Sequence, residues 1–286
     1  MKLTAALAQL TSTPSPEENA GLCAEMVRHA AAAGARLICL PEAANLMQRT
    51  HERLRETALS EADDPTLRQC RALAAALGVW IHIGSLILRD GDDFVNRGVL
   101  IAADGGVRAV YDKIHMFDAQ LAAGEQHRES ALFRPGARAV VASSPWGDLG
   151  LCICYDLRVP ALHRALAHAG ARILLNPAAF TRPTGGAHWR PLLRARAIET
   201  GCFVLAAAQC GQHGDGRATH GHSLVVSPWG EVMADGGDAP GLTVVTLDLA
   251  ASETARRQVP ALWNDRPFEV QRIGDGAEGQ EDQDER

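Results

Sequence analysis

The sequence lacks any long apolar run, and this argues against a membrane span. Runs such as residues 202–208 are far shorter than the ~18 to 20 residues that a helix needs to cross a bilayer. The short apolar start at residues 3–8 leads into Gln9 and Thr11 rather than a cleavage pattern, so no signal peptide is expected. We therefore expect a cytoplasmic protein that does not bind membranes.

Paired cysteines and basic stripes are also absent. The seven cysteines are odd in number, scattered and without a C-x-x-C pattern, which argues against a disulfide framework and a zinc ribbon. The 28 basic and 34 acidic side chains give a net charge of −6 with no basic stripe, so no nucleic-acid partner is expected. His213, His220 and His222 lie among glycines without a further ligand at fixed spacing, which favours structural histidines over a metal site.

What is present is an ordinary globular composition, with 47% hydrophobic and 22% charged residues in 286. Strand-like runs alternate with helix-length segments, and no linker or repeat divides residues 1–273. This pattern predicts one α/β domain of about ten or more strands, arranged as two packed sheets because one open sheet of that width tends to split. Residues 274–286 form an acidic tail that we expect to be mobile.

The expected elements follow from hydrophobic periodicity and from turn residues. Helices are predicted at residues 16–33, 65–77, 159–169 and 188–201. Strands are predicted at residues 3–8, 36–40, 79–88, 99–103, 107–112, 138–142, 149–154, 171–175, 202–207, 222–227 and 241–248. The polar stretch 114–136 has no clear period and is longer than a structureless loop in a compact domain ought to be, which is typical of a functional loop.

Three chemically useful side chains stand where predicted strands end. Glu42 follows Pro41, Lys113 follows the strand at 107–112, and Cys154 stands where an apolar strand gives way to polar residues. An acid, a lysine and a cysteine suit covalent acyl transfer, as base, cation and nucleophile. The alternatives are solvated caps for the charges and a core position for Cys154 like that of Cys152. Because the two cysteines alternate along a strand, only one of them can face a pocket.

At these residues the chain resembles the nitrilase superfamily of carbon-nitrogen hydrolases. The motifs that carry the likeness stand in order at residues 40–42 (LPE), 111–118 (YDKIHMFD), 133–136 (FRPG) and 152–158 (CICYDLR). Further segments resemble the Nit branch, which holds ω-amidases and deaminated-glutathione amidases: residues 177–181, 187–189, 192–199, 206–211 and 221–230. The likeness covers nearly all of residues 3–270.

The resemblance implies a four-layer α-β-β-α sandwich and catalysis without a metal or cofactor. It implies Glu42 as general base, Lys113 and the backbone N–H of Tyr155 as oxyanion stabilisers, and Cys154 as nucleophile. A second family glutamate falls on Glu129, where it would orient the lysine or the leaving group. The alternative for Glu129 is a solvated loop acid, which is less favoured because loops often carry function.

By the same matching, Arg158, Phe180 and Thr184 resemble the substrate pocket. The planar guanidinium of Arg158 suits a distal substrate carboxylate, and its alternative role is an ion pair with Asp156 or another acid. The chain departs from many relatives at three places near this pocket, which puts the exact substrate in doubt: Val159, Ala161 and Arg190.

We therefore expect an amidase that cleaves a terminal carboxamide on a small carboxylated acid and releases ammonia. Deaminated glutathione and the ω-amides of α-keto acids are the expected substrates. A nitrilase or an N-carbamoyl amino acid amidohydrolase with the same three residues is the nearest alternative. A non-catalytic binding protein on the same fold and a metallohydrolase are more remote. The resemblance also implies at least a homodimer.

Overall fold

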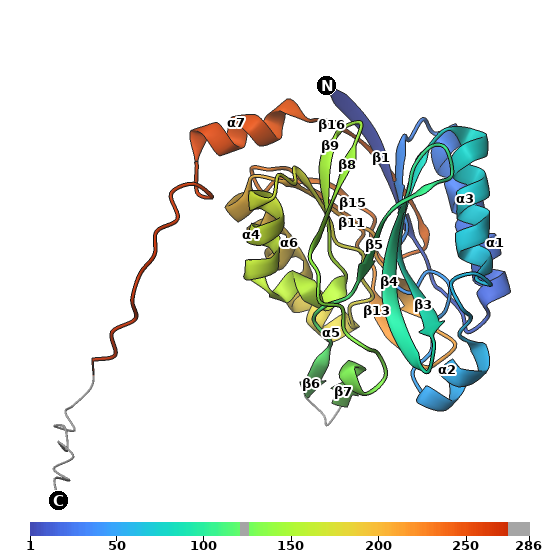
Figure 1. Ribbon diagram of the computed structural model, residues 1–286. Coiled ribbons are helices and arrows are strands. Elements are labelled where there is room, and N and C mark those ends of the chain that lie inside the picture. Colours follow the sequence, from blue (N-terminus) through green and yellow to red (C-terminus); the bar gives the residue numbers. More distant parts are fainter. Residues whose placement is uncertain (121–125, 274–286) are drawn as a thin grey trace, which may run out of the picture.

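Two six-stranded mixed sheets lie face to face, with helices on both outer faces, in a computed structural model that describes residues 1–120 and 126–273 (Figure 1). This is the expected α-β-β-α sandwich. The first sheet has the order β16-β1-β2-β3-β4-β5, with bounds Gly241–Asp248, Lys2–Gln9, Leu37–Cys39, Trp80–Asp90, Asp93–Ile101 and Val107–Asp112. The second has the order β15-β14-β11-β10-β9-β8, with bounds Val232–Asp235, Leu224–Val226, Phe203–Ala206, Ile173–Leu175, Gly147–Leu151 and Val140–Ser144.

The helices that cover the sheets connect neighbouring parallel strands. Helices α1 (Pro16–Ala32) and α3 (Pro65–Leu77) pack on the outer face of the first sheet, and α4 (Pro160–His168) and α6 (Arg190–Thr200) cover the second (Figure 1). Their starts follow from capping chemistry. The Ser15 hydroxyl accepts from the Glu18 N–H, and the Asp64 carboxylate accepts from the Leu67 N–H 2.8 Å away. Proline stands in the first turn of all four helices, where its missing N–H costs nothing.

Alternation along β1 shows how the chain fills two cores at once. Ala5 and Leu7 face the core between the sheets, whereas Ala6 and Ala8 face the core under α1 and α3. All four are fully buried. A strand buried on both faces reads as a continuous apolar run, as residues 5–8 do.

The two sheets repeat one strand pattern. β1, β2 and β3 are parallel neighbours with antiparallel β4 and β5 beyond, and β9, β10 and β11 are followed in the same way by β14 and β15. The crossovers match as well, since α1 and α3 stand where α4 and α6 stand in the second half. Glu42 therefore follows the second parallel strand of the first half, β2, and Cys154 follows the first parallel strand of the second half, β9.

The structure also corrects the sequence analysis at several elements. Residues 114–136 are not one loop, because β6 (Asp118–Gln120) and β7 (Gln126–Arg128) pair as a hairpin and a short 3-10 helix, η2 (Glu129–Ala131), follows. Helices α2 (His51–Thr57) and α7 (Ala250–Gln258) and strands β12 (Cys210–Gln212) and β13 (Ala218–His220) were not expected. The helix expected at 188–201 is preceded by α5 (Arg182–Thr184) and a π-helical turn, η4 (Gly185–Trp189). The acidic tail lies outside the described residues.

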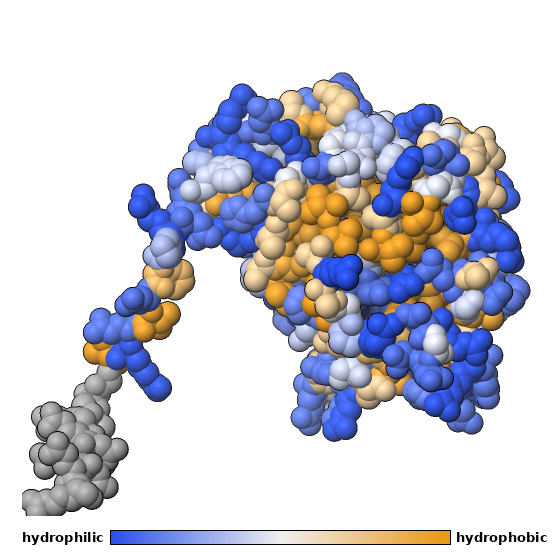
Figure 2. All heavy atoms as spheres, in the orientation of Figure 1, coloured by the Kyte–Doolittle hydropathy of each residue, from blue (hydrophilic) through white to orange (hydrophobic). Residues whose placement is uncertain are grey.

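An apolar area covers the front of the body where β4 and β5 meet β8 and β9 (Figure 2). Strand β5 supplies Val107 and Val110, which are 39% and 37% exposed, and Val140 and Val141 of β8 are half-buried. Within residues 1–120 and 126–273, no helix has the length and apolar character to cross a membrane.

Candidate active site

Glu42, Lys113 and Cys154 come together between the two sheets. Glu42 follows β2, Lys113 follows β5, and Cys154 begins the 3-10 helix η3 (Cys154–Arg158) after β9. Their exposed fractions are 5%, 2% and 8%. Three strand ends that are distant in sequence thus supply an acid, a cation and a thiol to one buried place.

Lys113 lies between two carboxylates. Its Nζ donates to Oε1 of Glu42 at 3.0 Å and to both carboxylate oxygens of Glu129 at 2.8 Å. Burial alone would lower the pKa of Lys113, but the charges of Glu129 and Glu42 raise it well above its ordinary value. The lysine is therefore a fixed positive charge, and Glu129, on η2, is hydrogen-bonded to it.

Asn96, on β4, completes this cluster and was not foreseen from the sequence. Its Nδ2 donates to Glu42 at 2.9 Å and to Glu129 at 3.3 Å, and its backbone oxygen accepts from the Lys113 N–H. The sequence contains little indication of this role, because an asparagine in a strand does not indicate a functional site unless its neighbours in the fold are known. Its side-chain oxygen is buried without a hydrogen-bond partner among the described residues.

Glu42 is held as a carboxylate. Its second oxygen accepts from the Ala179 N–H at 2.8 Å. Burial would raise the pKa of Glu42, but Lys113, Cys154 and Asn96 together lower it below its ordinary value. Burial raises the pKa of the Cys154 thiol well above its ordinary value, and the facing Glu42 carboxylate adds to this effect. The resting pair is thus an ionised acid beside a neutral thiol, which is what a base and its proton donor require.

The backbone at Cys154 is strained. Cys154 has φ +50° and Ala43, next to Glu42, has φ +52°, a region that non-glycine residues rarely adopt. The Cys154 N–H is fixed by the Pro177 carbonyl at 2.8 Å. No acceptor in the described part of the chain takes the next N–H, that of Tyr155. This N–H therefore remains open beside the sulfur.

A buried carboxylate ties the lysine segment to the cysteine turn. Asp156, with no exposed surface, accepts from the Tyr111 hydroxyl at 2.6 Å and from the Ile153 N–H at 2.9 Å. Its other oxygen accepts from the His115 N–H at 3.1 Å and lies 2.7 Å from that residue's Nδ1. One hydrogen-bond network thus joins the aspartate of the CICYDLR motif to the tyrosine and histidine of the YDKIHMFD motif. This network fixes Lys113 relative to Cys154.

Gly136 shows why the FRPG motif accompanies the lysine. Its N–H donates to the Lys113 carbonyl at 2.8 Å. A Cβ at this position would lie 2.2 Å from the backbone oxygen of Asp112, so only glycine lets the returning chain approach so closely.

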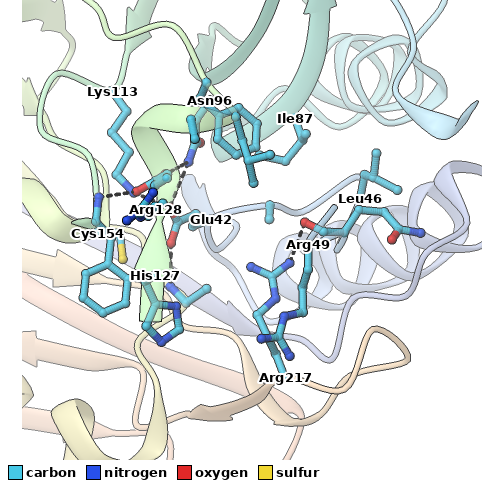
Figure 3. Close-up of a pocket in the computed structure, with 18 of the residues that line it drawn as sticks. Glu42, Leu46, Arg49, Ile87, Asn96, Lys113, His127, Arg128, Cys154 and Arg217 are labelled. Atoms are coloured by element: carbon cyan, nitrogen blue, oxygen red, sulfur yellow. Dashed lines mark hydrogen bonds and ion pairs between the residues drawn. The ribbon is translucent and has the colours of Figure 1, made fainter. Parts of the chain in front are cut away.

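The three groups open onto a cavity of about 360 Å³ (Figure 3). Lys113 and Cys154 lie at one end, Glu42 and Asn96 lie between, and Arg49 and Arg217 lie at the other end. Leu46, Ile87 and Phe133 give the wall an apolar part, and His127 and Arg128 of β7 line the opposite side. Neither Arg49 nor Arg217 was singled out from the sequence.

The structure does not place Arg158, Phe180 and Thr184 in the wall of this cavity: Arg158 is the last residue of η3, and Phe180 follows Ala179, which is in the wall. The Arg158 guanidinium carbon is 5.0 Å from the ring centre of Phe180 and 5.6 Å from that of Tyr155. Its Nη1 lies 3.1 Å from Nδ1 of His188, and no described carboxylate pairs with it. The alternative ion pair with Asp156 is therefore not formed. Thr184 is buried and its hydroxyl bonds to that of Thr181 at 2.8 Å.

The three histidines near residue 220 have structural partners. His213 bonds to the Ser12 carbonyl and the Thr219 hydroxyl, and His222 lies 2.9 Å from Asp235. Within the described residues, no group of three or more His, Cys, Asp or Glu could hold a metal ion.

Comparison with known proteins identifies the family. The sequence profile of carbon-nitrogen hydrolases matches residues 4–257. The chain belongs to the carbon-nitrogen hydrolase family. A curated relative of this hydrolase, the deaminated glutathione amidase of Bos taurus, is 43% identical over 269 residues, which cover 92% of this chain and 81% of the relative.

Solved structures agree with this assignment. The NitFhit protein of C. elegans superposes with a TM-score of 0.87 at 34% identity, covering 93% of the hydrolase and 65% of NitFhit, so the hydrolase spans about two thirds of that chain. An amidase from Nesterenkonia sp., in a variant with acrylamide added to its active-site cysteine, gives 0.76 at 28% identity, covering 91% and 99%. The hydrolase is thus an enzyme that acts on amides.

Proposed function

We propose that this hydrolase cleaves the side-chain amide of a small carboxylated acid, with deaminated glutathione or an ω-amide of an α-keto acid as substrate. The observation that carries the proposal is the buried cluster of an ionised Glu42, a charged Lys113 and a neutral Cys154 thiol around an open backbone N–H. The names of the curated relatives supply the substrate class. The expected cytoplasmic location and the reduced state of the cysteines belong to the same proposal.

In the first half-reaction, the Cys154 sulfur attacks the amide carbon while its proton passes to Glu42. The carbonyl oxygen becomes an oxyanion that accepts from Lys113 Nζ and from the Tyr155 N–H. The C–N bond then breaks, and the leaving nitrogen takes the proton from Glu42. The acyl group remains on Cys154 as a thioester.

In the second half-reaction, water attacks the thioester and gives a proton to Glu42. The same oxyanion donors stabilise the second tetrahedral state, and its collapse expels the sulfur, which recovers the proton. The product is a carboxylic acid. Glu129 takes no proton in this scheme; it holds Lys113 by two hydrogen bonds of 2.8 Å.

The acyl end of the substrate is assigned to the side of the cavity where Cys154 and Ala179 lie, from which Phe180 and Arg158 are the next residues outward. Arg158 has no carboxylate partner among the described residues, and it is stacked between two aromatic rings that keep its planar group in one orientation. A carboxylate on the acyl chain would complete this arrangement, with Phe180 and Thr184 beside it.

A substrate panel and two cysteine variants test the proposal. Amine or ammonia release is measured with deaminated glutathione, ω-amides of α-keto acids, a nitrile and an N-carbamoyl amino acid, and only the first two classes should be turned over rapidly. Cys154→Ala should abolish turnover, whereas Cys152→Ala, a fully buried neighbour in the core, should keep most of it. Mass spectrometry after a rapid quench should find the acyl group on Cys154, and an adduct on another cysteine would contradict the mechanism.

A further inference from the structure

Two arginines lie at the end of the cavity that faces away from Lys113 and Cys154 (Figure 3). Arg49 follows the segment that runs from Glu42 toward α2, and Arg217 lies between β12 and β13. Each arginine lies close to the residue that precedes the other arginine in the sequence. Arg217 Nη2 donates to the Gln48 carbonyl at 3.0 Å, and Arg49 Nη1 would lie 3.9 Å from a Cβ on Gly216.

Arg217 is held in place, whereas Arg49 has no counter-ion among the described residues. Arg217 Nε donates at 2.7 Å to Asp215, whose side chain is 3% exposed. No carboxylate of residues 1–120 and 126–273 lies within ion-pair distance of Arg49. Asp215 thus pairs with Arg217 alone, and the exposed Arg49 beside them has a positive charge that an anion in the cavity would balance.

The rest of the cavity wall does not supply that anion. Its described acids are Glu42 and Glu129, and both are bonded to Lys113. Its other bases are Lys113, Arg128 and His127. Lys113 and Arg128 balance the charges of the two glutamates at the reacting end (Figure 3), whereas Asp215 is the one described carboxylate paired with the two arginines of the outer end, so an excess of positive charge lies at the outer end.

The position of the proton donor tells which half of the substrate points outward. The leaving nitrogen must lie beside Glu42, which returns the proton to it. Ala43, Leu46 and Gln48 continue along the cavity wall from Glu42 to Arg49. A group attached to the leaving nitrogen would therefore extend along these residues toward Arg49 and Arg217, while the acyl chain occupies the side of Tyr155 and Arg158.

The path does not end at the arginines. A second hollow of about 800 Å³ shares Gln48 and Arg49 with the cavity, and Pro14, Thr50, Arg53 and Gly214 are also in its wall. A leaving group several bonds long has room there, whereas ammonia needs none of this space.

We propose that Arg49 and Arg217 form a carboxylate subsite for the amine half of the substrate. The hydrolase then prefers amides whose leaving amine carries a carboxylate, as a dipeptide does, over primary amides that release ammonia. Deaminated glutathione, whose amide nitrogen belongs to a dipeptide, fits this rule. The inference rests on the proposed function and chooses between the two substrate classes left open there.

The test uses three amides with one acyl group and different leaving groups. The acyl group is that of deaminated glutathione, and the leaving groups are its dipeptide, ethylamine and ammonia. For the wild-type enzyme, kcat/KM should be highest with the dipeptide and lower by about tenfold or more with ethylamine and ammonia, as expected for the loss of a charge-assisted contact.

Three variants then show which residues cause the preference for the dipeptide leaving group. Arg49→Ala should lower kcat/KM for the dipeptide amide by about tenfold and change the ethylamide and the primary amide less than about twofold. Arg53→Ala is the matched control, because Arg53 lines the second hollow but is already paired with Glu56 at 2.9 Å. Arg217→Lys keeps the charge and should give a smaller selective loss, with the melting temperature reporting any damage to the contact with Asp215.

The outcomes separate the two proposals. Equal losses on all three amides in Arg49→Ala, or none on any, would overturn the carboxylate subsite while the proposed function stands. Failure of the wild-type enzyme to hydrolyse any amide of this acyl group would overturn the proposed function itself.

Discussion

Glu42 has a lowered pKa although it is buried, and this sets the acid side of the pH profile. Because Lys113, Cys154 and Asn96 outweigh the cost of burial, Glu42 stays ionised until the pH falls below its ordinary value of 4.5. We expect kcat/KM to be flat from about pH 5 to about pH 8 and to fall only below about pH 4.5. A pH–rate profile checks this, and an acid limb near neutrality would show that burial dominates instead.

The same lowered pKa links protonation to folding. A depressed carboxylate stabilises the fold above its unfolded pKa of about 4.3, and that stability is lost as the pH falls through the folded value. The melting temperature of the wild-type hydrolase should therefore drop more steeply below about pH 4.3 than that of Glu42→Gln, which has no such proton to take up. Parallel curves for the two proteins would contradict the assignment.

Arg158 gives a residue-scale test of the acyl end. Arg158→Lys keeps the charge but loses the planar group stacked on Phe180 and Tyr155, so kcat/KM for amides with a carboxylated acyl chain should fall by roughly tenfold. Simple aliphatic amides should be little affected. Arg164→Lys, at an exposed ion pair with Asp265, is the control. An equal loss on both kinds of amide, with a lowered melting temperature, would show a structural role.

The motifs of the sequence were sufficient to find residues that the structure brings together around the thiol. They were not sufficient to find the residues that hold this cluster in place by hydrogen bonds. Glu42, Lys113 and Cys154 stand in contiguous motifs that can be read along the chain, and Glu129 was found as the family glutamate that falls between the lysine and the cysteine. The carboxylates that Asn96 binds are 33 and 54 residues away in the sequence, and Tyr111 and His115, which Asp156 binds, are 45 and 41 residues away. Only the folded chain therefore shows these partners. Arg49 and Arg217 are further apart still and lie in segments without any motif.

At the scale of elements, the turn at Gly136 decides where Lys113 can lie. Gly136→Ala would push a Cβ into the Asp112 carbonyl 2.2 Å away and displace the segment that carries the lysine. We expect a loss of about 2 kcal/mol in the free energy of unfolding and a fall in kcat at permissive temperature. Chemical denaturation and steady-state kinetics measure the two effects.

The matched control for this change is Gly186→Ala, where no heavy atom lies within 4 Å of the added Cβ and the backbone needs no positive φ. It should leave stability within about 0.5 kcal/mol of the wild type. Should Gly136→Ala behave like this control, the close approach at the FRPG motif would not matter to the fold.

The sequence predicted the elements that have a regular hydrophobic pattern or a helix-capping residue. The bounds of α3 and β16 agree with the prediction, because Asp64 and Pro65 begin the helix and an extended β-rich run forms the strand. The three-residue strands β6, β7, β12 and β13 escaped prediction because such short segments have no period. Each of them pairs with its neighbour along the chain, β6 with β7 and β12 with β13, outside the two large sheets.

For the whole molecule, the C-terminal segment suggests how copies associate. Leu262 still packs in the core and Trp263 contacts His168, but farther on the chain leaves the body (Figure 1), and Phe268, Val270 and Ile273 are 83% to 88% exposed there. Apolar side chains in an extended segment are better accommodated on another surface than in water. We propose that a second copy covers them, in keeping with the homodimer that the family resemblance implies.

Two truncations test this association. Removal of residues 267–286 should shift the hydrolase toward monomer in light scattering, because Phe268, Val270 and Ile273 are lost. Removal of residues 274–286 alone should leave both the association and kcat unchanged. A full-length protein that runs at the mass of one chain at all concentrations would contradict the dimer.

Strand β1 leaves the ribosome long before one of its two neighbours in the sheet, β16. Lys2 to Gln9 pair along their whole length with Asp248 to Gly241, so the ribosome adds roughly 230 residues before this side of β1 finds its partner. Until then, a strand whose residues 5–8 are all apolar presents a bare edge to other nascent chains. Translation that stops short of β16 would therefore yield an aggregation-prone product in which this edge of β1 stays unpaired.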